Sequence, residues 1–534
     1  MNYTIDPFNL STAEREKLVD TLLNEVDFHE IPHNEFLNKA SLLIDLSLDL
    51  NRKDGLDVAI NQLHSFVNLE LSDFEKSLGH YFLANTLGNR NELEKKSGTP
   101  ISKWANITIE DEILNFRLSL KHIRSIEQKN FHQNLNKYPY LGSPDQRLCQ
   151  IFTNLGNLMD DIGRFIEGIE CRENSLKIDP KHGMAMGNKG FSYMWYALFL
   201  PQNTSQKAIF YHESYNLLKT ALNYKLEYDA AEAGFRKAMV FIESKLEKNY
   251  LDSKLSLNHH LKGSKNEIRY KQWCLENRLF LNTLNDLGPW TIAATDDLII
   301  PVGEMRVDYG INCHTFFNHL KQEFVAARYL YYEGISKNKR HFSDNGLIFG
   351  ETYDRPLLSL ASEKIKISFR LAYSIFDKIA FFIYYYFKLD LNERDIYFRS
   401  VWYQNKKKNP QAKKIAQVFQ NNDKNLPLIG LFWLSKDIYE KNTGFVDALE
   451  PDAKGWYDIR NSLEHKYFKI TFFNSEIDSL SSVINDINSP FMESITIDEF
   501  EKKTLKLLKT VRNALVYLVL AINYEEYQKT KNKK

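Results

Sequence analysis

Proline and glycine are scarce in this sequence, with 14 prolines and 22 glycines among 534 residues. Architectures built from many short strands need these residues at their turns, because they supply the backbone conformations that turns require. Their scarcity disfavours an all-β protein. We therefore expect an all-α chain.

Cysteine is also rare, and the four cysteines are scattered without a CxxC spacing. A disulfide framework or a zinc site would need closely spaced or clustered cysteines. We expect buried apolar residues in a reducing compartment instead. The four positions are Cys149, Cys171, Cys274 and Cys313.

No apolar run is long enough to cross a membrane. The most apolar runs, Ile379–Phe387 and Ala514–Ile522, span nine residues each, whereas a membrane helix needs roughly 20. Both runs are predicted to be buried core helices. The first ten residues lack the basic and apolar regions of a signal peptide, so we expect a cytoplasmic protein with no membrane partner.

No charge of one sign dominates, since Lys+Arg and Asp+Glu both number 69. Any surface that attracts nucleic acid must therefore be local. Hydrophobic residues make up 43% and charged residues 26%, as in ordinary folded proteins. The length predicts about two to four domains.

Several catalytic motifs are missing, namely GxxxxGK[ST], GxGxxG, HExxH and GxSxG. Their absence disfavours a P-loop NTPase, a dinucleotide enzyme, a zincin and a serine hydrolase. We expect neither a cofactor nor a metal.

The segment Cys149–His182 has the spacing of a helical repeat of about 34 residues. Small residues stand where two helices would cross, apolar residues fill the seam, and a proline follows the second helix. These residues are Leu155, Gly156, Met159, Gly168, Ser175 and Pro180. The segment resembles a tetratricopeptide repeat, although Arg172 replaces the usual aromatic residue. Weaker helix pairs precede it, so residues 1–285 are predicted to form a tetratricopeptide-like α-solenoid.

The helical rhythm breaks near Asn285–Pro301, which predicts a domain boundary there. Residues 286–534 are predicted to form a bundle of four or five helices. The main predicted helices are Phe316–Ile335, Leu357–Leu389, Leu426–Lys441, Asp452–Phe468 and Ile497–Tyr527.

The predicted helix Asp452–Phe468 carries the residues with the clearest chemistry. Its buried face would contain Trp456, Ile459, Leu463 and Tyr467. Asn461 and His465, at i and i+4, share another face, and Arg460 can reach toward it. An imidazole that titrates near neutrality can move a proton, and a guanidinium can hold a phosphate. These groups suit RNA cleavage by the 2′-hydroxyl.

The spacing alone leaves an alternative open. Arg460 could instead pair with Glu464 on an ordinary solvated helix face. Arg117 and His122 have the same spacing within a predicted repeat helix, and we interpret that second pair as a coincidence.

Asp377 stands inside an apolar, aromatic stretch, where an unpaired carboxylate is costly. It is predicted either to orient Arg460 or His465 or to form an ion pair with Lys378 or another neighbour.

The pattern Arg-Asn-x3-His late in a helical bundle resembles the signature of the HEPN superfamily (higher eukaryotes and prokaryotes nucleotide-binding). The phrase LAYSIFDKIAFF resembles the core helix of the branch with tetratricopeptide-like repeats in front. The resemblance covers about residues 290–530 and, more loosely, 30–250. It implies a metal-independent endoribonuclease that acts as a homodimer, often a toxin or antiviral effector. Arg460 and His465 match the catalytic pair, and Asn461 matches the polar residue after the arginine.

Tyr467 extends this pattern to Arg-x4-His-x-Tyr. In one HEPN toxin branch, this tyrosine is modified by a nucleotidyltransferase antitoxin. A place in the helical core is the alternative that we favour for Tyr467.

The expected partners are RNA, a second copy of the chain, and a protein or peptide ligand on the repeats. Lysines beside Trp402 and Tyr403, including Lys406–Lys408, Lys413 and Lys414, mildly support binding of single-stranded RNA. The alternative function is a non-catalytic module that binds a nucleotide or a partner on a repeat scaffold.

Overall fold

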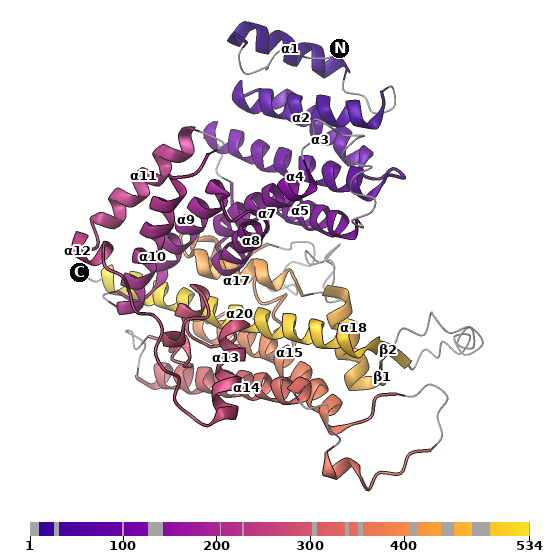
Figure 1. Ribbon diagram of the computed structural model, residues 1–534, viewed down its shortest axis with the longest axis vertical. Coiled ribbons are helices and arrows are strands. Elements are labelled where there is room, and N and C mark those ends of the chain that lie inside the picture. The colour runs from indigo at the N-terminus through magenta and orange to yellow at the C-terminus, as the bar shows by residue number, and fades with distance from the viewer. Residues whose placement is uncertain are drawn as a thin grey trace. The chain divides into compact units, whose positions relative to one another are not determined.

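The computed structural model is almost entirely α-helical in the residues that it describes (Figure 1). This confirms the expected fold class. In that part of the chain, regular strands are limited to one short pair, β1 (Tyr467–Thr471) and β2 (Met492–Thr496). The described residues are 10–25, 31–98, 101–126, 143–202, 204–226, 229–301, 307–336, 341–350, 356–404, 414–438, 453–472 and 492–532.

The chain divides into two compact units. The first consists mainly of Met1–Ser192 and Asn216–Val240. The second consists mainly of Tyr193–Tyr215, Phe241–Ala448 and Asp452–Lys534. A division into folding domains at residue 285 stays a prediction.

The first unit is built from helices that pack in sequence order. Polar caps start several of them: Ser72 accepts the Glu75 main-chain N–H in a reciprocal capping box, and Ser143 caps a helix that begins with Pro144. Pairs that pack closely include α4 with α5 and α7 with α8. The helices are α1 (Thr12–Glu25), α2 (His33–Asp49), α3 (Lys53–Phe66), α4 (Asp73–Lys96), α5 (Ile107–Ser125), α7 (Pro144–Asp161) and α8 (Phe165–Ile178). Along the chain, α9 (Gly183–Phe199), α10 (Ser205–Ala221) and α11 (Asp229–Glu243) follow.

The α7–α8 pair explains why Arg172 is tolerated where an aromatic residue was expected. Gly156 and Gly168 leave room at the crossing, since a Cβ on Gly156 would lie 3.2 Å from the Gly168 carbonyl oxygen. Arg172 is fully buried there, and its guanidinium pairs with Asp160 at 2.9 Å and donates to Asn157. A buried ion pair therefore occupies the aromatic position. Assignment of the helices as tetratricopeptide-like repeats stays a prediction.

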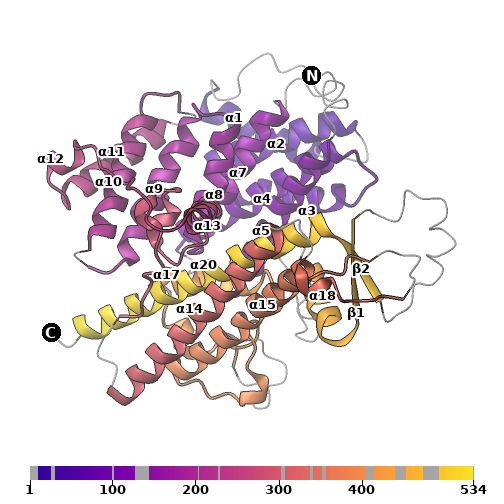
Figure 2. The same ribbon diagram turned by 60° about the horizontal axis from the view of Figure 1, so that its bottom comes forward.

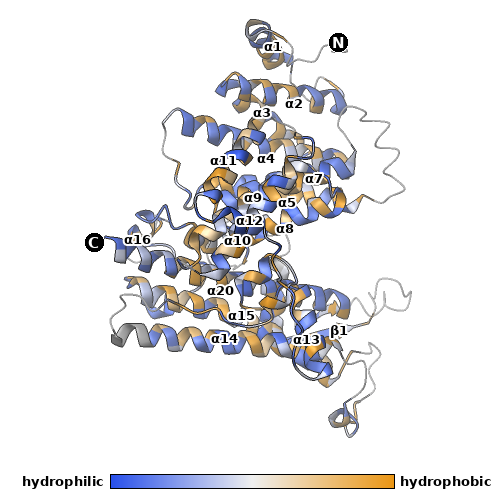
Figure 3. Ribbon diagram, turned by 60° about the vertical axis from the view of Figure 1, so that its left-hand side comes forward, coloured by the Kyte–Doolittle hydropathy of each residue, from blue (hydrophilic) through white to orange (hydrophobic). Residues whose placement is uncertain are grey.

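The core of the second unit consists of three long helices that run side by side (Figure 2). They are α14 (Val307–Ser336), α15 (Leu360–Phe387) and α20 (Ile497–Lys531), with α17 (Leu426–Ser435) against α20. All residues of Ala514–Ile522 are buried, as predicted. Apolar and polar residues alternate along these helices (Figure 3). Among the described residues, no helix is long and apolar enough to cross a membrane.

Shorter elements complete the second unit. They are α12 (Lys248–Leu251), α13 (Lys265–Glu276), α16 (Gln417–Gln420), α18 (Ala453–His465) and the 3-10 turns at Thr283–Asp286, Thr291–Ala293, Phe342–Asp344 and Glu393–Asp395.

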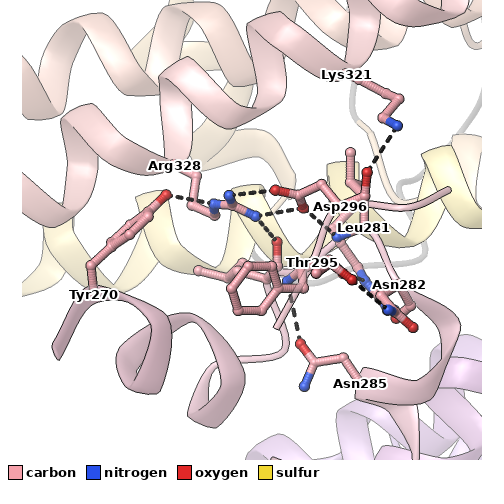
Figure 4. Close-up of polar contacts among 11 residues, drawn as sticks. Tyr270, Leu281, Asn282, Asn285, Thr295, Asp296, Lys321 and Arg328 are labelled. Atoms are coloured by element: carbon pink, nitrogen blue, oxygen red, sulfur yellow. Dashed lines mark hydrogen bonds and ion pairs between the residues drawn. The ribbon is translucent and has the colours of Figure 1, made fainter. Parts of the chain in front are cut away.

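The segment from Leu279 to Leu298 contains two short 3-10 turns, and residues 279–288 of it are buried. Two arginines of the bundle bind this segment. Arg328 of α14 forms a two-pronged ion pair with Asp296 and also donates to the Leu279 carbonyl and to the Tyr270 hydroxyl (Figure 4). Lys321, about two turns earlier on the same face of α14, donates to the Asp296 carbonyl (Figure 4). These bonds replace the hydrogen bonds that a regular helix would supply.

The second arginine, Arg512 of α20, lies with Asp286 in a pair fully shielded from solvent. Its guanidinium also donates to the carbonyls of Phe280 and Asn282, at 3.0 and 2.7 Å. Tyr196 donates to the other carboxylate oxygen of Asp286 at 2.8 Å. Every charge in this cluster is thus matched, as burial requires.

One predicted element is shorter than expected. The helix predicted over Asp452–Phe468 ends at His465, and β1 begins at Tyr467 and pairs in parallel with β2. Tyr467 is 48% exposed, so its predicted place on the buried helix face is wrong. Because Tyr467 lies in a strand, the alternation of side chains along that strand determines which way its side chain points, and helical periodicity does not apply.

Candidate functional site

The candidate residues lie on α18, which the bundle holds by its apolar face. Trp456, Ile459 and Leu463 are buried, as predicted, and α18 packs against α15. The Ser462 hydroxyl donates to the Glu493 carboxylate of β2. One face of α18 is therefore fixed by packing, and its other residues are left for polar contacts.

Arg460 and Asn461 contact each other at the edge of this buried face. The Arg460 guanidinium donates to the Asn461 side-chain oxygen at 3.1 Å. Both side chains are partly exposed. The amide therefore restrains the guanidinium without neutralising its charge.

Asp377 of α15 lies within electrostatic range of Arg460. Burial raises the pKa of the Asp377 carboxyl, and the Phe398 main-chain N–H and the Arg460 charge oppose that rise. Lys378, the alternative partner predicted for Asp377, instead binds both carboxylate oxygens of Glu323 at 2.6 Å. The structure thus brings Asp377 and Arg460 together.

His465 is the last residue of α18 and is exposed to solvent. Among the residues that the structure describes, none forms a hydrogen bond with its ring. The last turn is instead held by Arg370 of α15, which donates to the Leu463 carbonyl and lies 3.6 Å from Glu464. Glu464 is therefore engaged by Arg370, and the ion pair between Arg460 and Glu464 that we considered is not formed.

Sequence reasoning missed Arg370 and Glu493. Arg370 precedes Asp377 by seven residues, so both project from one face of α15, and this spacing could have identified it. Glu493 gave no such signal, because its contact with Ser462 depends on the pairing of β1 with β2.

The second Arg-x4-His pair lies in a different setting. His122, on α5 of the first unit, binds the Asp73 carboxylate at 2.7 Å, and its ring stacks on His80 at a centroid distance of 5.8 Å. Asp73 starts α4, so His122 ties the two helices together. A structural contact accounts for this histidine.

The predicted aromatic platform for RNA is wrong. Trp402 is fully buried and Tyr403 is 5% exposed, because both pack in the second unit's core around Phe432. Neither ring can stack on a base. Lys406–Lys408 and Lys413 lie outside the described residues, and Lys414 is exposed.

Metal-ligating side chains do not gather in the part of the chain that the structure describes: no three His, Cys, Asp or Glu side chains there could hold one ion. The groups on or near α18 that could transfer a proton include Asp377, Glu464, His465 and Glu493. They can accept or carry protons without a metal.

Comparison with known families gives a match that covers the bundle. Residues 306–525 match the family model described as LA2681-like HEPN. The matched region runs from the start of α14 into α20 and contains Asp377, Arg460, Asn461 and His465. It supports the HEPN superfamily for this part of the chain. No match was found among the curated proteins or among the solved structures.

Proposed function

We propose that residues 306–525 form a metal-independent endoribonuclease that cleaves RNA by attack of a 2′-hydroxyl. A HEPN domain is consistent with either an RNase or a nucleotide-binding module. The observation that favours cleavage is the state of His465: it is exposed at the end of α18, and no described residue forms a hydrogen bond with its ring. A proton-transfer group needs this freedom to reach substrate.

Each group has one chemical task in this proposal. His465 takes the proton from the 2′-hydroxyl or gives one to the departing 5′-oxygen. The oxygen attacks phosphorus, the P–O5′ bond breaks, and the products carry a 2′,3′-cyclic phosphate and a 5′-hydroxyl. Arg460 stabilises the charge that grows on the phosphoryl oxygens. Asn461 and Asp377 position Arg460.

One histidine cannot readily serve as both base and acid in a single turnover. We propose that a second copy of the chain supplies the second histidine across a two-fold axis. Regulation by the helical repeats, and a role as a toxin or antiviral effector, belong to the same proposal.

The test is cleavage of single-stranded RNA by the purified full chain in EDTA, with analysis of the product ends. We expect cyclic phosphate ends from the wild type and loss of cleavage in Arg460→Ala and His465→Ala. His319→Ala is the matched control, because His319 is an exposed histidine on α14 of the same unit. Tight RNA or nucleotide binding without products would favour the non-catalytic module instead.

A further inference from the structure

The first unit contains a hollow of about 640 Å³, lined by residues of α2, α4, α5 and α7 and of the segment before α5. This volume lies within the range of small-ligand sites. Aromatic rings form part of its wall, from Tyr81, Phe82 and Phe116, and the remainder is mainly polar. The hollow is large enough for one side chain with the main chain on either side of it.

Glu112 of α5 lines this hollow, and only 9% of the residue is exposed. No hydrogen-bond donor or ion-pair partner for it exists among the described residues. A buried carboxyl without a partner is costly and is rarely retained for folding alone.

The backbone opposite makes room for this carboxyl. A Cβ on Gly88 of α4 would lie 2.7 Å from a Glu112 carboxylate oxygen. Any side chain at position 88 would therefore displace the carboxyl from its place in the wall. The position of the Glu112 carboxyl therefore depends on a glycine at position 88 of α4.

The other charged groups of the hollow already have neighbours that balance them. Asp161 lies 2.9 Å from Lys103 and 3.6 Å from Lys95, and Glu92 lies 2.9 Å from Lys96. Arg147 lies over the Tyr81 ring and within electrostatic range of Asp45. Among the described residues, no cation forms an ion pair or a hydrogen bond with Glu112; Lys95 acts on it only through its charge, as Arg147 does on Asp45.

Side-chain amides complete the wall. Asn85 and Asn154 are joined by a hydrogen bond of 2.7 Å, and Asn89, Asn91 and Gln150 also line the hollow. The buried Gln150 side-chain oxygen accepts no hydrogen bond within the described structure. Amides both donate and accept, so they match the main chain of a peptide.

We propose that this hollow binds a protein or peptide segment whose lysine or arginine side chain forms an ion pair with Glu112. The cation supplies the partner that Glu112 lacks, and the amides bond to the main chain beside it. This site lies entirely within the first unit and does not depend on RNA cleavage.

The electrostatics of the hollow agree with a cationic occupant. Burial raises the pKa of Glu112 to about 8, the Asp161 charge adds to the rise, and Lys95 opposes it. The remaining charged groups that line the hollow are Lys103, Arg147, Asp45 and Glu92. At pH 7 the empty site therefore holds a proton on Glu112, and a bound cation displaces it.

Isothermal titration of the full chain with small probes tests this site. The probes are N-acetyl-arginine amide, N-acetyl-lysine amide and the uncharged N-acetyl-citrulline amide. We expect the cationic amides to bind and citrulline amide to bind far more weakly. Titration in phosphate and in Tris at pH 7 should reveal release of close to one proton for each cation bound.

Two variants distinguish the contribution of the Glu112 charge from that of other acids in the first unit. Glu112→Gln keeps the shape and should weaken cation binding about ten- to hundredfold, the value of a charged hydrogen bond. Glu70→Gln, at an exposed acid of the same unit outside the hollow, should leave binding unchanged. Circular dichroism and the melting temperature establish that both variants are folded.

Three results would overturn the proposal. They are no binding of either cationic amide, equal binding of citrulline amide, or unchanged affinity in Glu112→Gln. Spermidine carries cations without a peptide main chain, and its tighter binding than arginine amide would overturn the assignment to a peptide.

Discussion

Asp377 of α15 lies close enough to Arg460 of α18 for the guanidinium to oppose the rise in the carboxyl pKa that burial causes. The two residues come from helices that pack against each other in the second unit. A buried carboxylate beside a partly exposed guanidinium restricts where that cation can lie, as outer residues do for metal ligands and phosphate-binding groups.

Replacement of Asp377 should therefore reduce catalysis without removing substrate binding. We expect Asp377→Asn to lower kcat for RNA cleavage about ten- to hundredfold with little change in KM, because the arginine is retained but less well placed. Asp377→Glu should recover part of the loss. Steady-state kinetics with a short RNA test this. A parallel fall in melting temperature that accounts for the lost activity, without recovery in Asp377→Glu, would indicate a purely structural role.

If the site is shared by two chains, RNA cleavage should depend on the ratio in which wild type and His465→Ala are mixed. When wild type and His465→Ala are co-expressed at different ratios, activity should fall with the square of the wild-type fraction, because both histidines are needed. Wild type and His465→Ala carry different tags, so that the ratio of the two chains in each preparation can be measured. A linear fall would show that one chain cleaves alone. Mixtures of wild type and His319→Ala serve as the control and should keep full activity.

The buried pair of Arg512 and Asp286 should be the strongest polar contribution to the second unit's stability. Removal of one partner leaves a buried charge unmatched, so Arg512→Ala should destabilise the protein by about 3–5 kcal/mol. Lys502→Ala, at an exposed position on the same helix, should change stability by less than about 0.5 kcal/mol. Urea unfolding followed by tryptophan fluorescence measures both. Similar midpoints for the two variants would contradict this ranking.

Glu112 should make stability depend on pH in a defined direction. Its pKa rises from an ordinary 4.5 to about 8 because the group is buried. Folding therefore favours the protonated form, and stability falls as pH rises from about 4.5 to about 8. The melting temperature of wild type minus that of Glu112→Gln should decrease across this window. A difference that stays constant between pH 5 and pH 9 would mean that the carboxyl is not buried in solution.

Much of the helical framework could be predicted from the sequence, because local apolar periodicity determines it. The helix predicted over Leu357–Leu389 is observed as Leu360–Phe387, and the one predicted to start at Ile497 does so. The buried face of α18 also follows from periodicity, except at Tyr467.

The failures all depend on contacts between distant segments. The strand at Tyr467 forms because residues 492–496 lie beside it, which no local pattern records. The hydrogen bonds of the segment after Asn285 could not be predicted either, because Arg328 and Arg512, which bind its Asp296 and Asp286, come from distant helices. Trp402 stands near lysines in the sequence but packs in the core. For the candidate site, the residue types could be proposed from the motif, whereas the choice between Arg460 and Lys378 as the cation that acts on Asp377 needed the structure.

The most direct test of the central claim is the single-turnover rate of cleavage of a single-stranded RNA in EDTA by wild type and by His465→Ala. We predict cleavage by the wild type and a fall of about 100-fold or more in His465→Ala, because a proton-transfer group contributes about this much to the rate. Cleavage by His465→Ala at the wild-type rate would contradict it.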